Sequence, residues 1–131
     1  MSNAVKRELV KLIDMELQAA NEKFPLFHSA HEGYAVMRED VEEASDTRAE
    51  LAWIAEELWE SIKDNSSAGK LHSHYTKLYI ASRNLAIEAI QCAAMARKNI
   101  LSSVEMRRID APGTGGEIGE LSEGELMEGG Y

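Results

Sequence analysis

The sequence contains a single cysteine, Cys92, and therefore cannot form a disulfide within one chain. One cysteine of this kind is typical of a reducing compartment, so we expect a cytoplasmic protein. Aromatic residues make up only 6% of the chain, so a core must be built from Ala, Leu, Ile and Met. The sequence shows no strand-like alternation, internal repeat or glycine-rich phosphate loop, and no hydrophobic stretch of signal-peptide or bilayer-spanning length. These absences leave a small, soluble, helical protein as the expected class.

Acidic residues outnumber basic residues in this sequence. The 131 residues carry a formal net charge of −9, and segment 110–131 contributes six of those negative charges without any Lys or Arg. The mildly acidic body lacks the basic patch that nucleic acids or anionic membranes require, so we expect neither partner. Segment 109–131 also holds Pro112 and seven glycines. We therefore predict one domain over residues 1–108, followed by a disordered, Gly- and Glu-rich tail over 109–131.

Apolar residues at helical spacing predict a first helix that stops before Pro25, because the residue preceding a proline is disfavoured in a helix. Residues 24–27 are expected to form an extended connector whose two phenylalanines pack on the core. Ser29 followed by Glu32 has the spacing of a capping box and predicts the start of a second helix.

The second helical region is interrupted weakly at residues 45–47, where we expect a break or a kink, and resumes up to about Asp64. A last helix is predicted to start between Leu71 and Thr76 and to run to about Val104. The sequence therefore predicts an all-α fold, an antiparallel bundle of about four helices.

The most informative stretch is the apolar run 84–96, in which Glu88 is the only carboxylate. Neither glycine nor proline interrupts the run, and its alanines favour the interior of a helix that a neighbouring helix can approach closely. An isolated buried carboxylate is costly, so Glu88 must be neutralised, paired or bound to a metal.

A second group of acidic residues can supply that metal site. Glu39, Glu42 and Glu43 are three or four residues apart and share one helix face, as do Glu88 and Gln91. If the two helices pack antiparallel, these side chains converge on one small volume. Ligation by oxygen alone suits Mg²⁺, with Mn²⁺ as an alternative, rather than zinc.

Simpler interpretations stay open. Acid-rich helix segments are usually solvated surfaces, and Glu88 can instead pair with Lys77, with Arg83 or with a base on another helix. None of the four histidines follows a Glu by three residues, which argues against a di-iron carboxylate site. Trp53 and Trp59 are expected to cover the core or an interface rather than to stack a base.

The residues between about 24 and 104 resemble the all-α nucleoside-triphosphate pyrophosphohydrolases of the MazG-like branch. The family motif is Glu-x-x-Glu on one helix and Glu-x-x-Asp on a later helix. Glu39-Asp40-Val41-Glu42, followed by Glu43, resembles the first half. Glu88-Ala89-Ile90-Gln91 resembles the second half, with Gln91 where the family usually has Asp.

The resemblance implies hydrolysis of a (deoxy)nucleoside triphosphate between its α and β phosphates, giving the monophosphate and pyrophosphate. By position it implies that Glu39, Glu42, Glu88 and Gln91 ligate Mg²⁺, and that Glu43 is an outer ligand or orients the attacking water.

The same resemblance makes Arg97 and Lys98 candidates to hold the phosphate chain, with ordinary surface charges as the alternative. It also implies a homodimer or higher homo-oligomer with alanine-rich helices at the interface. A second hypothesis is a catalytically silent helical homo-oligomer that acts as a scaffold or partner-binding module.

Overall fold

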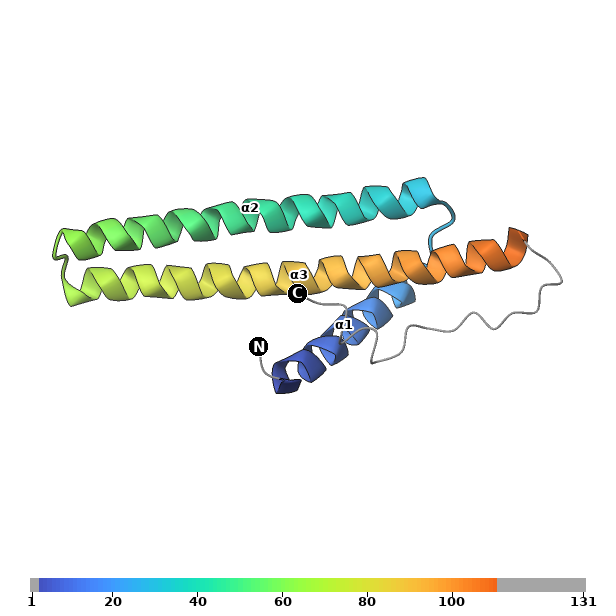
Figure 1. Cartoon of the computed structure of the whole chain (residues 1–131), viewed down its shortest axis with the longest axis horizontal. Coiled ribbons are helices and arrows are strands. Elements are labelled where there is room, and N and C mark those ends of the chain that lie inside the picture. Colours follow the sequence, from blue (N-terminus) through green and yellow to red (C-terminus); the bar gives the residue numbers. More distant parts are fainter. Residues whose placement is uncertain (1–2, 111–131) are drawn as a thin grey trace. The chain divides into compact units, whose positions relative to one another are not determined.

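The computed structural model describes residues 3–110, which form three helices and no strand (Figure 1). Helix α1 spans Asn3–Lys23, α2 spans Ala30–Lys63 and α3 spans Ala68–Asp110. The all-α prediction is therefore confirmed, whereas the count of about four helices is not. The predicted tail over 109–131 lies almost wholly outside the described residues.

The expected break at 45–47 is absent, because α2 continues through it without interruption. Ser45 and Asp46 are exposed on the helix surface, and Thr47 is half-buried beside Ala44 on the inner face. Polar residues interrupt a helix only when their side chains compete for the backbone hydrogen bonds, and residues 34–63 include neither Gly nor Pro.

Capping residues define the helix ends. The Glu32 N–H donates to Ser29 Oγ (3.1 Å) and the His28 N–H donates to Glu32 Oε2 (3.1 Å), which confirms the predicted start of α2. Helix α3 begins earlier than predicted because Ser67 caps it, accepting the Lys70 N–H at 3.2 Å. Helix α2 ends in a Schellman-type turn, where Asn65 adopts φ 53° and the Ser66 N–H donates to the Ser61 carbonyl.

The chain divides into two compact units, one made of residues up to 38 and from 90 onward, the other of Glu39–Ala89. Helices α2 and α3 each contribute a segment to both units. No described helix is both long enough and apolar enough to cross a membrane.

In the first unit, the connector after α1 packs on the last part of α3. Phe27 is buried and its N–H donates to Ser102 Oγ (2.9 Å), which in turn donates to the Lys98 carbonyl (2.8 Å). Phe24 is 68% exposed, so the expectation that both phenylalanines pack on the core is wrong for that residue. Its backbone is held instead, because Lys98 Nζ donates to the Phe24 carbonyl (3.2 Å).

Replacing Ser102 with alanine is expected to lower the free energy of unfolding by about 1–2 kcal/mol, because the buried Phe27 N–H loses its acceptor. Chemical denaturation followed by circular dichroism measures the change. The matched control is Ser103→Ala, at an exposed neighbouring position, for which we expect almost no change. Equal stability of both variants would contradict the connector's dependence on Ser102.

The second unit is an antiparallel hairpin of α2 and α3 with a regular inner seam. Buried and half-buried residues alternate three and four apart along both helices, which is the heptad spacing of a coiled coil. On α2 they are Ala44, Thr47, Leu51, Ile54, Leu58 and Ser61, and on α3 they are Leu71, His74, Leu78, Ala81, Leu85 and Glu88.

One hydrogen bond sets the register of this seam. Ser61 Oγ and His74 Nε2 lie 2.9 Å apart, so these residues form one cross-hairpin layer. Counting away from the turn, the next layers contain Leu58 with Leu78, Ile54 with Ala81, and Leu51 with Leu85. The following layer pairs Thr47 with Glu88, so polar layers flank the apolar ones at both ends.

Candidate functional site

Glu88 belongs to the seam of the hairpin, and counting heptad positions from the Ser61–His74 pair places it level with Thr47. The residue is half-buried, and its Oε2 atom is inaccessible to solvent and has no hydrogen-bond partner. Arg83, one of the cations considered as its partner, lies over the Tyr79 ring instead, 6.0 Å from the ring centroid. A buried carboxylate oxygen without a partner is costly, so the prediction that Glu88 must be neutralised, paired or bound to a metal gains a structural basis.

The acidic residues of α2 do not surround Glu88. Glu39, Glu42 and Glu43 are all exposed. Since Glu88 is level with Thr47, helical rise places Glu43 about 6 Å and Glu39 about 12 Å farther along the hairpin axis. Residues 3–110 contain no group of three or more His, Cys, Asp or Glu arranged to hold a metal ion. The structure thus does not bring the predicted carboxylates together, and the ligand set stays a prediction.

Positions around the helix separate the three glutamates further. Glu43 and Glu39 precede Thr47 by four and eight residues and lie on the flank of α2 that borders this seam residue, whereas Glu42 projects from the outer face, opposite the seam. Among the acidic residues at the start of this segment, Glu43 is therefore the best placed to turn toward Glu88.

Asp40 is a candidate that the sequence analysis missed. It is half-buried and lies four residues before Ala44, in line with the α2 seam, whereas its acidic neighbours are exposed. The heptad spacing that runs through Ala44 and Thr47 could have singled it out. The family motif instead selects Glu39 and Glu42, followed by Glu43.

The remaining predicted residues belong to the first unit. Gln91 is half-buried on α3, one turn after Glu88. Arg97 forms an ion pair with Asp14 of α1. Lys98 is only 2% exposed, and its ammonium lies 4.8 Å from the centroid of the Phe27 ring. Both basic side chains are thus engaged within the protein, and phosphate binding by either one stays a prediction that requires an exchange of partners.

The surroundings of Lys98 also affect its protonation. Burial lowers the pKa of the Lys98 ammonium from its usual value, and the nearby Glu32 carboxylate opposes that shift. Together with the bond to the Phe24 carbonyl, this environment identifies Lys98 as part of the packing of the connector.

No protein-family model, curated protein or solved structure matches this chain. The case for a function therefore depends on the residues of the hairpin and on the motif resemblance.

Proposed function

We propose that the protein is a Mg²⁺-dependent nucleoside triphosphate pyrophosphohydrolase that releases pyrophosphate and a nucleoside monophosphate. The observation that supports the proposal is Glu88 Oε2, a buried carboxylate oxygen without a hydrogen-bond partner in the motif that resembles the family. Such an atom is expected where a ligand completes the site, since native proteins rarely leave buried polar atoms unsatisfied.

The donor chemistry suits a hard cation, because the Glu88 carboxylate and the acidic residues of the hairpin offer only oxygen. Glu88 is the fixed element, and Glu39, Glu42 and Gln91 are the other proposed ligands. Glu43, whose side chain is exposed on the flank shared with Thr47, is the proposed water-orienting residue. Because these acids are exposed and Glu42 projects from the face opposite the seam, binding a cation beside Glu88 requires this segment of α2 to shift relative to α3, not only a turn of the side chains. Bound Mg²⁺ would neutralise phosphate charge and lower the pKa of a bound water.

A nucleotide assay tests the proposal. The full chain is incubated with Mg²⁺ and each common ribo- and deoxyribonucleoside triphosphate, and the release of pyrophosphate and monophosphate is measured. We expect turnover of at least one nucleotide, abolished by a chelator, and a Mg²⁺-dependent rise in melting temperature. Release of orthophosphate, or turnover that persists in chelator, would contradict the proposed reaction.

The catalytically silent homo-oligomer is the second candidate. It is favoured by the absence of an assembled group of three metal-binding side chains within residues 3–110 and by the many exposed large apolar side chains. No turnover together with no Mg²⁺-dependent thermal shift would support this candidate over the hydrolase.

A further inference from the structure

The first unit contains a groove between the beginning of α2 and the end of α3. Its volume is about 410 Å³, and we call it the α2–α3 groove. Its walls are apolar, with Tyr34 and Met37 on the α2 side and Met106 on the α3 side. Tyr34 is 57% exposed, and the two methionines are half-buried. Methionine side chains adapt to the shape of what they contact, so these walls suit apolar side chains of an added segment.

Hydrogen bonds within the unit fix the floor of the groove. Asn99 Nδ2 donates to the Gly33 carbonyl at 3.1 Å, which ties α3 to α2. Ser102 Oγ accepts the Phe27 N–H and is buried. Because these polar groups already have partners, an occupant of the groove needs apolar side chains for the walls rather than donors or acceptors for the floor.

The α2–α3 groove lies in a basic part of an acidic chain. Apart from His31, the ionisable groups of residues 29–38 and 98–108, one residue beyond each end of the lining, are Arg38, Lys98, Arg107, Arg108, Glu32 and Glu105. Both acids are engaged locally, since Glu32 accepts the His28 N–H and Glu105 pairs with Arg108 at 3.9 Å. Four bases against two engaged acids make this region attractive to a negatively charged segment.

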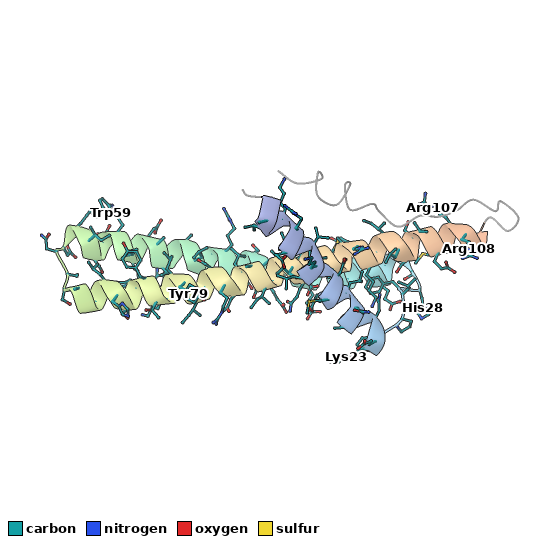
Figure 2. The ribbon with its side chains drawn as sticks, turned by 90° about the horizontal axis from the view of Figure 1, so that it is seen from below. Lys23, His28, Trp59, Tyr79, Arg107 and Arg108 are labelled. Carbon is teal, nitrogen blue, oxygen red and sulfur yellow. The ribbon has the colours of Figure 1, made fainter. Side chains whose placement is uncertain are left out.

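Arg107 places positive charge at the groove itself. It is exposed and belongs to the lining, and Figure 2 labels it beside Arg108 near the end of α3. None of the described residues that line this groove is acidic. The hollow near the turn of the hairpin has the opposite character, because its lining includes Glu56, Glu57, Glu60 and Asp64. An acidic segment would be repelled there and attracted to the α2–α3 groove.

The chain itself supplies a segment with matching chemistry. Residues 111–131 contain five glutamates and no Lys or Arg. Ile118 and Leu121 are three residues apart, and each directly follows a glutamate, Glu117 or Glu120. A segment with so few apolar residues cannot build a core of its own, so it buries them only against a surface that already exists. Acidic stretches interspersed with apolar residues are typical of interaction segments.

This segment starts beside the groove. Arg107 precedes the end of α3 at Asp110 by only three residues. The eight residues from Asp110 to Ile118 span up to about 26 Å when extended, whereas the groove from Arg107 back to Asn99 is about 12 Å long by helical rise. Pro112-Gly113 is a turn-forming pair that allows the chain to reverse. A short tether of this kind gives an effective concentration on the order of millimolar, so a weak contact is sufficient.

We propose that segment 117–121 of the same chain docks in the α2–α3 groove. Ile118 and Leu121 pack between the apolar walls, and a neighbouring glutamate pairs with Arg107. The docked segment covers the walls and excludes any other acidic, apolar peptide from them. The contact goes beyond the proposed hydrolase and stands independently of it, since the groove contains none of the predicted metal ligands or phosphate-binding residues.

Disulfide formation within the full chain tests the proposal. In a Cys92→Ser background, Ser122→Cys is combined either with Ser103→Cys, in the groove lining, or with Glu105→Cys. Positions 103 and 105 are both exposed and almost equally distant along the chain, but they project from opposite sides of α3. On mild oxidation, the groove pair is expected to form an intramolecular disulfide at least about tenfold faster than the control pair.

Equal rates for the two pairs, followed on a non-reducing gel and by peptide mapping, overturn the proposal. Preferential linkage between chains would place the segment on another copy and also overturns it. Arg107→Gln is expected to slow the groove cross-link about two- to fivefold, whereas Arg108→Gln, outside the lining, should leave it unchanged. A loss with Arg108→Gln alone contradicts the assigned charge contact.

Methyl NMR of methionine provides a second readout without added cysteines. The double variant Ile118→Ser/Leu121→Ser, with both changes outside the helices, is expected to shift the methyl resonance of Met106. The resonance of Met15, which is 64% exposed on α1 and absent from the groove lining, should stay in place. An unchanged Met106 resonance, or an equal shift at Met15, contradicts docking in this groove.

Discussion

Replacing Glu88 with glutamine is expected to reduce Mg²⁺-dependent pyrophosphate release at least about a hundredfold, which is more than the loss that follows removal of a group supporting a metal ligand. The substitution keeps the size and shape of the side chain and removes only its negative charge. The helix content should therefore be unchanged by circular dichroism, and the Mg²⁺-dependent rise in melting temperature should disappear.

Glu56→Gln is the matched control, because Glu56 is an exposed glutamate on the same hairpin and lies on the outer face of α2. Its activity and Mg²⁺ response should match those of the wild type. Full activity of Glu88→Gln would rule out Glu88 as a metal ligand, whether or not the protein hydrolyses nucleotides.

Glu88→Leu separates the function of this residue from its effect on stability. A leucine would complete the apolar seam opposite Thr47, and we expect the metal-free protein to gain about 1–4 kcal/mol of unfolding free energy while losing activity. Denaturation in chelator measures the gain. Opposite changes of stability and activity at one residue are the signature of a ligand, whereas a purely structural ion pair would lose stability.

Gly33→Ala is expected to destabilise the first unit by about 2–4 kcal/mol, although alanine is the better helix former. A Cβ built at Gly33 would lie 2.8 Å from Asn99 Cγ and 3.1 Å from Phe27 Cδ2, and closer still to Asn99 Oδ1. Asn99 cannot move away without cost, because its amide donates to the carbonyls of Gly33 and Met95, each at 3.1 Å. Differential scanning calorimetry should show a melting temperature lower by roughly 10 °C or more.

Gly69→Ala supplies the control for helix propensity. Gly69 lies in the first turn of α3, and a Cβ there meets no atom within 4 Å. The alanine variant should be as stable as the wild type or up to about 1 kcal/mol more stable. A similar loss of stability in both alanine variants would show that the contact with Asn99 is not the reason why position 33 requires glycine.

The helices could be predicted from the sequence because their signals are local. Pro25, Ser29 and Glu32 act on neighbouring backbone groups, so the end of α1 and the start of α2 followed from spacing alone. The continuity of α2 through Thr47 could not be predicted from spacing, because it depends on which side chains the partner helix buries. Likewise, Phe24 and Phe27 look alike in sequence, and only the position of α3 decides that one is buried.

The candidate site was predictable only in part. Glu88 stood out because an acidic residue in an apolar run needs a compensating partner, and the structure leaves its Oε2 buried and unsatisfied. Whether the acidic side chains of the two helices converge could not be predicted from the spacing of residues within each helix. The distance between Glu88 and Glu39 depends instead on the register of the hairpin. That register follows from the Ser61–His74 layer, a pairing that nothing in either local sequence predicts.

The heptad spacing of the hairpin makes its length adjustable in fixed steps. Deleting seven residues from α2 and the seven residues opposite them in α3 would shorten the hairpin by about 10 Å, yet every remaining side chain would keep its orientation. Deleting three or four residues from one helix would instead rotate everything beyond the cut relative to its partner. Natural variation in the length of this hairpin should therefore occur in paired multiples of seven.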